Sequence, residues 1–303
     1  MTKKFLLYSS PIMLMFLAIA LFEPWIYLHV LTSSEIDESL KQEHFDIIAH
    51  KGASGSAPEN TMAAFQIALD LGVDMIELDV RNTHDEEIVV FHDETLERTT
   101  NGTGAVHDYT LEELKKLDAG SWFDPKFSDE RIPTLKEVLD LVSSAKGKCK
   151  VLIEIKHMDH PHYQDFAEKL IDVIREEENG YDWIILQSME VDYIDAAHDY
   201  DDHVQTKKLM IGEDSAPLIA FYIETKMHLG HAKENDRMKA LNPEYHTLST
   251  RRVFRMHARG FEVYTYSPNN RDDMVKMLHM GVDGIITDNP EILVQIRKEI
   301  EEL

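Results

Sequence analysis

The chain has 303 residues, of which 31 are Lys or Arg and 56 are Asp or Glu, so its formal net charge is −25. This acidic excess excludes sequence-independent binding to nucleic acid, which needs Lys and Arg to displace counterions from phosphates. A hydrophobic content of 43% excludes a disordered chain, and a single cysteine excludes internal disulfides and cysteine-rich metal sites.

The chain begins with an apolar segment. Residues 5–22 carry no formal charge and follow Lys3 and Lys4. At about 1.5 Å per residue such a segment spans roughly 27 Å, close to the thickness of a bilayer core. Residues 1–31 are therefore predicted to be a membrane anchor or a signal peptide cut after Ala20, and the anchor is favoured because the apolar stretch continues further. The remaining chain would be extracytoplasmic if anchored, and secreted or periplasmic if cleaved.

Strand-like and helical patterns alternate through most of the remaining sequence. Residues 32–43 are polar and acidic and predict a spacer, and residues 44–303 predict one domain. Alternation of strands and helices over about 260 residues predicts an α/β protein with a parallel sheet, and the length fits a (β/α)8 TIM barrel. The expected strands are Asp46–His50, Met75–Val80, Ile88–His92, Lys150–Lys156, Trp183–Ser188, Lys207–Ile211, Lys239–Asn242, Glu262–Tyr266 and Gly284–Thr287. The expected helices are Asn60–Leu71, Thr110–Leu117, Thr134–Ser143, Tyr163–Glu177 and Arg271–Leu278.

Nine strands are one too many for an eight-stranded barrel. Val80 and Ile88 are separated by a short polar link, whereas a parallel crossover needs a dozen or more residues. Either these two segments form a local hairpin, or one of them is an irregular extended segment. Residues 93–131 show little periodicity and predict a small insertion at one end of the fold.

Three carboxylates stand on two of the predicted strands. Glu77 and Asp79 are two residues apart, so their side chains share one face of a strand, and Glu154 and Lys156 are related in the same way. A solvated strand face or a neutralised pair in the core would account for each strand taken alone. Taken together, the three carboxylates suit a hard cation, Mg²⁺ or Ca²⁺, because oxygen is the ligand that such ions prefer.

Two histidines follow apolar strands directly. His50 ends the first predicted strand and His92 ends the third. Two imidazoles with ordinary pKa values can act as base and acid in one reaction. Lys51 and Lys156 add positive charge. Three carboxylates, a divalent ion and two lysines sum to +1, which suits a phosphodiester with its single negative charge.

The ordered motifs resemble the glycerophosphodiester phosphodiesterase family over about residues 46–300. The resemblance is carried by the following blocks: His50-Lys51-Gly52-Ala53-Ser54-Gly55, Pro58-Glu59-Asn60-Thr61, Ile76-Glu77-Leu78-Asp79-Val80, Val89-Val90-Phe91-His92-Asp93 with Arg98-Thr99-Thr100, Ile132-Pro133-Thr134-Leu135, Ile153-Glu154-Ile155-Lys156 and Gly281-Val282-Asp283-Gly284-Ile285-Ile286-Thr287-Asp288-Asn289-Pro290.

The resemblance implies a (β/α)8 barrel like that of phosphatidylinositol-specific phospholipases. It implies hydrolysis of deacylated phospholipid diesters to glycerol 3-phosphate and an alcohol, with one divalent cation, Mg²⁺ or Ca²⁺. A cyclic phosphate intermediate is implied by the same resemblance. The residues implied are His50 and His92 as the acid/base pair, Glu77, Asp79 and Glu154 as metal ligands, Lys51 and Lys156 as phosphate contacts, and Trp122, Phe123 or Tyr264 as an aromatic side chain near the substrate.

Two departures from the family pattern concern substrate binding. Lys51 stands where the family usually has Arg, which keeps the charge and loses the bidentate fork. The segment Tyr264-Thr265-Tyr266-Ser267 replaces the usual Trp-Thr-Val-Asn. Two other functions remain open: lysophospholipase D-type cleavage of acylated diesters at the membrane, and non-catalytic binding of a phosphate ligand.

Overall fold

The computed structural model describes residues 40, 44–145, 149–156, 163–210 and 238–303. Within these residues the strands form one sheet. Their bounds are β1 (Asp46–Ala49), β2 (Met75–Asn82), β3 (Ile88–Val90), β4 (Lys150–Ile155), β5 (Ile184–Ser188), β6 (Gln205–Met210), β7 (Met238–Pro243), β8 (Glu262–Tyr266) and β9 (Gly284–Thr287). Eight of them are parallel and close into a barrel in the order β1-β9-β8-β7-β6-β5-β4-β2, because β1 also pairs with β2.

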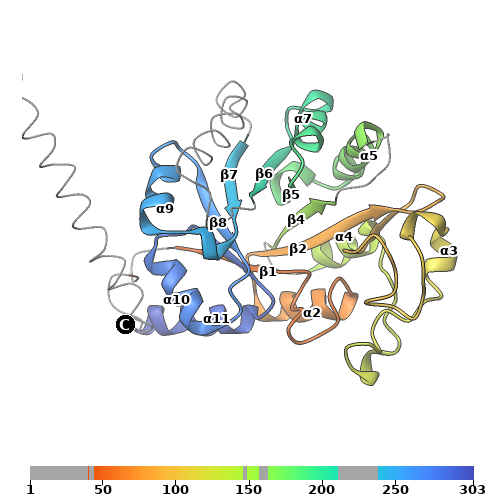
Figure 1. Cartoon of the computed structure of the whole chain (residues 1–303), viewed down its shortest axis with the longest axis horizontal. Helices are drawn as coiled ribbons and strands as arrows, with labels where there is room; N and C mark the ends of the chain where they lie inside the picture. The colour runs from red at the N-terminus through yellow and green to blue at the C-terminus, as the bar shows by residue number, and fades with distance from the viewer. Residues whose placement is uncertain (1–39, 41–43, 146–148, 157–162, 211–237) are drawn as a thin grey trace, which may run out of the picture.

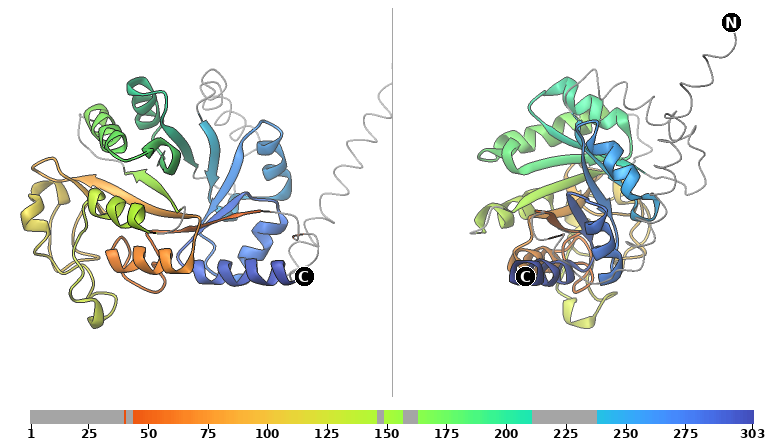
Figure 2. Two further views of the ribbon diagram at one scale, coloured as in Figure 1. Left: turned by 180° about the vertical axis from the view of Figure 1, so that it is seen from behind. Right: turned by 90° about the vertical axis from the view of Figure 1, so that its left-hand side faces the viewer.

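Helices surround the barrel (Figure 1, Figure 2). Their bounds are α2 (Met62–Leu71), α3 (Leu111–Leu114), α4 (Leu135–Ser144), α5 (Tyr163–Glu176), α6 (Gly180–Trp183), α7 (Val191–Tyr200), α9 (Thr250–His257), α10 (Arg271–His279) and α11 (Pro290–Glu302). Short 3₁₀ turns occur at η2 (Val106–Asp108), η3 (Pro125–Phe127) and η4 (Tyr245–Thr247). The predicted TIM barrel is therefore confirmed.

Alternation along each barrel strand divides the core into two layers. On β4, Val151 and Ile153 pack outward against the helices, whereas Leu152 packs into the barrel interior. Glu154 follows with the same parity as Leu152 and therefore faces the interior near the carboxyl end of β4. In TIM barrels this end carries the active site.

The ninth strand forms a hairpin with its predecessor. β3 pairs antiparallel with β2, with Val80 opposite Val90. Of the two alternatives that the short link left open, the structure shows the hairpin. The barrel thus keeps eight parallel strands, and β3 is attached beside β2.

The segment between β3 and α4 is irregular and lies to one side of the barrel, beyond β2 (Figure 1). Its helix α3 is fixed by reciprocal hydrogen bonds: the Thr110 side chain accepts from the Glu113 backbone, and the Glu113 side chain accepts from the Thr110 backbone. This is the capping box that the spacing Thr-x-x-Glu indicates. The helix itself is shorter than predicted and ends at Leu114.

The predicted membrane anchor or signal peptide lies outside the described residues. Of the predicted spacer only Leu40 is described, and its side chain is buried in the outer core layer. Among the helices of the described residues, none is both long and apolar enough to cross a membrane.

Candidate active site

Three buried carboxylates form the centre of the site. Glu77 and Asp79 extend from β2 and Glu154 from β4, and one oxygen of each lies within 4.8 Å of the others. Asp79 and Glu154 are direct neighbours across the two strands. The structure therefore brings together the three carboxylates that the sequence singles out.

Neutral amides hold two of these carboxylates in place. Asn60 donates to Asp79 at 2.7 Å, and Gln187 donates to Glu77 at 3.2 Å. Asn242 in turn donates to Gln187 at 2.8 Å. All three amides are buried. Only Asn60 belongs to a motif that the sequence brought forward, and Gln187 and Asn242 were missed.

Lys156 forms ion pairs with two of the three carboxylates. The Lys156 ammonium lies 3.0 Å from Asp79 and 2.5 Å from Glu154. Burial and the nearby charge of Asp79 raise the pKa of Glu77 to about 8. Burial alone would also raise the pKa of Asp79, but the combined charges of Lys156, Lys51 and the two histidines outweigh it and hold that pKa well below its usual range.

The charge of the cluster fits a divalent cation. Three carboxylates and Lys156 carry a formal charge of −2 when all are ionised, and the raised pKa of Glu77 shows that the third negative charge is unfavourable without a counterion. One Asp79 oxygen has an ion pair with Lys156 but no hydrogen bond among the described residues. The all-oxygen set suits Mg²⁺ or Ca²⁺.

His50 follows β1 and is held by a distant carboxylate. Its Nδ1 lies 2.5 Å from Asp288, just beyond β9, and its Nε2 lies 4.0 Å from Glu77. The pKa of Asp288 is lowered to about 2, so the carboxylate is ionised and Nδ1–H donates to it. Burial alone would lower the pKa of His50, but the hydrogen bond to Asp288 and the charge of Glu77 raise it.

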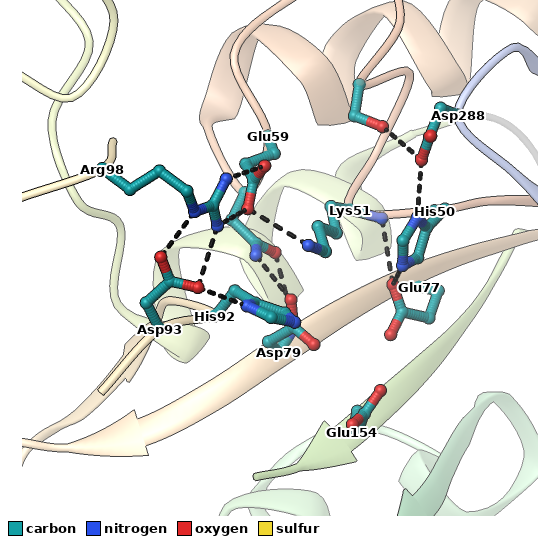
Figure 3. A network of polar contacts seen from close by, with 12 residues as sticks. His50, Lys51, Glu59, Glu77, Asp79, His92, Asp93, Arg98, Glu154 and Asp288 are labelled. Atoms are coloured by element: carbon teal, nitrogen blue, oxygen red, sulfur yellow. Dashed lines mark hydrogen bonds and ion pairs between the residues drawn. The ribbon is translucent and has the colours of Figure 1, made fainter. Parts of the chain in front are cut away.

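His92 has the same arrangement on the other side of the cluster. Its Nδ1 lies 2.6 Å from Asp93, whose pKa is lowered to about 2 by hydrogen bonds that outweigh burial. Burial lowers the pKa of His92, and the charges of Lys156 and Lys51 add to this effect against the opposing charge of Asp79. Figure 3 shows His92 beside Asp79 and His50 beside Glu77. Each imidazole therefore has Nδ1–H engaged and Nε2 as its remaining basic nitrogen.

Arg98 connects the two loops that carry these groups. Its guanidinium donates to Glu59 at 2.8 and 2.7 Å and to Asp93 at 2.5 and 3.0 Å. Glu59 also accepts from Lys51 Nζ at 3.1 Å. Figure 3 shows this chain of contacts, which joins Lys51 to His92 through two carboxylates and one guanidinium.

The turn after β1 fixes the Lys51 backbone. Lys51 N donates to Glu77 at 3.0 Å. Gly52 has a φ of +79°, and a Cβ there would lie 2.7 Å from the Ala64 backbone, so this position requires glycine. Gly55 N donates to the Asp288 carbonyl at 2.7 Å, so the same turn packs on the loop that carries the partner of His50.

Of the predicted aromatic contacts, Tyr264 points away from the carboxylates. The Tyr264 hydroxyl lies 3.0 Å from Asp46 and 3.2 Å from Glu262, the first residues of β1 and β8, at the amino ends of the strands. Trp122 is exposed in the segment between β3 and α4, where its indole nitrogen donates to the Ala119 carbonyl. The structure does not bring the Tyr264 hydroxyl to the cluster.

Phe123 and Tyr266 are the aromatic residues next to Trp122 and Tyr264 in the two segments just described. Phe123 packs edge-on against Trp122, with ring centroids 5.7 Å apart. Tyr266 ends β8, and its pKa is raised to about 12 by burial and by the nearby charges of Glu244 and Glu154. The Tyr266 hydroxyl donates to the Met210 carbonyl at 3.1 Å, so this side chain lies toward the carboxyl ends of the strands, unlike the Tyr264 hydroxyl.

Known proteins share both the sequence and the architecture. A sequence model of the glycerophosphoryl diester phosphodiesterase family matches residues 50–292. The chain is 39% identical over 250 residues to the glycerophosphodiester phosphodiesterase of Caldanaerobacter subterraneus, covering 82% of this chain and 96% of the relative. It is 33% identical over 266 residues to that of Bacillus subtilis, covering 83% and 86%.

A solved structure extends the comparison to the fold. The phosphodiesterase of Oleispira antarctica, in complex with the product sn-glycerol-3-phosphate, superposes with a TM-score of 0.72 and 26% identity, covering 84% of this chain and 96% of that one. The matched residues include the two histidines, the three carboxylates and both lysines of the site. The chain belongs to the glycerophosphoryl diester phosphodiesterase family and is a phosphoric diester hydrolase.

Proposed function

We propose that this protein hydrolyses glycerophosphodiesters to glycerol 3-phosphate and an alcohol, with one divalent cation and two histidines. One observation carries the proposal: two imidazoles, each held through Nδ1 by an ionised carboxylate, flank a cluster of three buried carboxylates. The product named for the Oleispira antarctica complex agrees with this substrate class.

Each imidazole is oriented for proton transfer at Nε2. Asp288 and Asp93 fix the rings by accepting from Nδ1–H, so Nε2 of one ring can take the proton of the attacking hydroxyl. Nε2 of the other ring, when protonated, can donate to the oxygen of the leaving alcohol. The carboxylates also stabilise the imidazolium that forms during transfer.

The acidic cluster would hold the cation. Glu77, Asp79 and Glu154 supply the oxygen ligands, and Asn60 and Gln187 orient two of them. A bound Mg²⁺ or Ca²⁺ supplies positive charge to a phosphate oxygen and acidifies a bound hydroxyl. Lys51 and Lys156 are the phosphate contacts that this site offers from its own residues.

A substrate panel tests the proposal. The full chain is incubated with deacylated glycerophosphodiesters and with lysophospholipids, with Mg²⁺, Ca²⁺ or chelator. Release of glycerol 3-phosphate from the former and of acylated glycerol 3-phosphate from the latter is followed by ³¹P NMR. We expect release from the deacylated diesters that stops with chelator. Preference for the acylated diesters would support the lysophospholipase D alternative. Calorimetric binding of a diester without turnover would favour a binding protein and contradict hydrolysis.

Replacing Arg98 by Met is expected to lower kcat by roughly 10–100-fold, because misplacement of a catalytic group by about 1 Å is costly. Arg98→Lys should recover little, since lysine cannot bridge two carboxylates in a bidentate manner. Because Arg98 holds Asp93, the pH dependence of kcat should also change. An unchanged pH profile with lowered thermal stability would indicate a purely structural role.

We further propose that residues 1–31 anchor the enzyme in a membrane, with the catalytic domain extracytoplasmic. The support is the uncharged segment at residues 5–22 behind two lysines. In a bacterial host, the full chain should sediment with membranes and resist carbonate extraction, and a chain starting at residue 33 should not. Recovery of a shortened, soluble chain outside the cytoplasm would instead show cleavage.

A further inference from the structure

A cavity lies at the opposite end of the barrel from the carboxylate cluster. Its volume is about 790 Å³. Asp46, Lys150 and Glu262 line it, and each is the first residue of its barrel strand. The cavity therefore opens at the amino ends of the strands, whereas Asp79 and Glu154 stand near the carboxyl ends of theirs.

Lys207 is the buried charged group of this cavity. It is the third residue of β6, it lines the cavity, and its side chain is only 4% exposed. Its Nζ has no hydrogen-bond partner among the described residues. Nζ lies over the ring of Tyr264, 3.0 Å from its centroid, in a cation–π contact.

The described residues around Lys207 provide no hydrogen-bond acceptor for its ammonium group. An ammonium has three N–H donors, and burying it without acceptors is unfavourable. The aromatic ring compensates for part of this cost. Two of the acidic groups that line the cavity, Asp46 and Glu262, accept from the Tyr264 hydroxyl rather than from Lys207. Burial accordingly lowers the pKa of Lys207 to about 7, although the charges of both acids raise it.

We propose that this cavity binds a small oxyanion, a phosphate or a carboxylate, with Lys207 as its principal ligand. An anionic oxygen would supply the acceptor that Nζ lacks. Among the residues that line the cavity, three lysines (Lys150, Lys207 and Lys239) match three acids (Asp46, Asp202 and Glu262), so with Lys207 charged the lining carries no net negative charge to oppose an anion. The site is separate from the catalytic residues, and the inference does not rest on the proposed function.

The experiment compares the full chain with Lys207→Met, which keeps the length of the side chain and removes its charge. Inorganic phosphate and butyrate are titrated calorimetrically in the presence of chelator. Lys116→Met is the matched control, because Lys116 is exposed and paired with Glu112 in α3. Protein labelled with ¹³C at lysine Cε identifies the Lys207 resonance as the one missing from the Lys207→Met spectrum.

We expect Lys207→Met to weaken binding of one or both anions at least tenfold, while kcat with glycerophosphodiesters stays unchanged and Lys116→Met behaves as wild type. The Lys207 resonance should shift on saturation with the bound anion. Phosphate binding alone would identify a phosphate site, and butyrate binding alone a carboxylate site. Unchanged titrations in Lys207→Met, or a Lys207 resonance that neither anion moves, would overturn the proposal. If Lys207→Met does not fold, Lys207→Gln and the NMR titration of wild type decide the matter.

Discussion

Alanine in place of His92 or His50 is expected to lower kcat by roughly 10²–10⁴-fold at saturating metal, the usual contribution of a positioned acid or base. Each ring is held by a carboxylate at Nδ1 and offers Nε2 for proton transfer, so alanine removes the proton-transfer group at that position. Steady-state release of glycerol 3-phosphate measures the loss. The exposed His107, in η2, provides a control substitution that should leave the rate unchanged.

Replacing Asp288 or Asp93 by asparagine tests whether the orientation of the imidazole that each holds is needed for activity. Asp288→Asn and Asp93→Asn keep the shape of the side chain but can donate to Nδ1 and so favour the other tautomer. Both variants should fold normally and still lose most of their activity. Near-normal rates in both histidine-to-alanine variants would show that the acid/base assignment is wrong.

Glutamine at Glu77 is expected to reduce activity at least roughly 100-fold, because even residues that only orient metal ligands contribute about 10–100-fold to affinity or activity. Affinity for Mg²⁺ or Ca²⁺, measured by calorimetry, should fall in parallel. The control is Glu112→Gln, which removes a carboxylate from an exposed ion pair on α3. Full activity of Glu77→Gln in chelator would contradict the proposed metal site.

Metal binding should also displace a proton. Burial and Asp79 raise the pKa of Glu77 to about 8, so without metal this carboxyl is mostly protonated at pH 7. A cation binds only the ionised form, and its affinity should therefore increase with pH up to about 8. Calorimetric titrations in buffers of different ionisation enthalpy measure the released proton. In Glu77→Gln this component should disappear.

The same group links pH to stability without metal. A carboxyl whose pKa is higher in the folded than in the unfolded state binds more protons when folded, so its contribution to stability falls as pH rises from about 4.5 to about 8. The free energy of unfolding of wild type, relative to Glu77→Gln, should decline over that range in chelator.

Much of the barrel could be predicted because its strands are short apolar runs. All nine predicted strands occur, with ends that differ by at most two residues. The helices were harder to predict than the strands. On α9 (Thr250–His257) only Val253 and Met256 are buried, so the apolar face that identifies a helix is reduced to two residues. The helices α7 and α11 were likewise not predicted individually.

The site shows where sequence reasoning ends. Side-chain alternation placed Glu77 and Asp79 on one face of a strand, and Glu154 was predicted to join them from a second strand; the register of β2 and β4 shows Glu154 directly beside Asp79. The partner of His50 was not assigned, because Asp288 is 238 positions away and only barrel closure brings β9 beside β1. The sequence places Arg98 in a family motif but does not predict its contacts, because its two carboxylate partners, Glu59 and Asp93, come from separate loops.

Tyr264 shows the limit of reasoning from a motif. Alternation correctly indicates that residues 264 and 266 share a face, but it does not say which end of the barrel a long side chain approaches. The Tyr264 hydroxyl lies near Asp46 and Glu262 at the amino ends, whereas the Tyr266 hydroxyl donates to the carbonyl of Met210, the last residue of β6. A substrate contact by Trp122 or Phe123 stays a prediction.

The attachment of His92 through β3 has a consequence for inactivation. β3 pairs with β2 outside the closed ring, and a backbone hydrogen bond from Val90 to Pro133 adds a second attachment. Ile88, Val89 and Val90 are nevertheless all buried, so the hairpin is held by side-chain packing as well as by hydrogen bonds. The position of His92 therefore depends on the packing around β3, and loosening that packing would displace this imidazole while His50 stays attached to the closed ring.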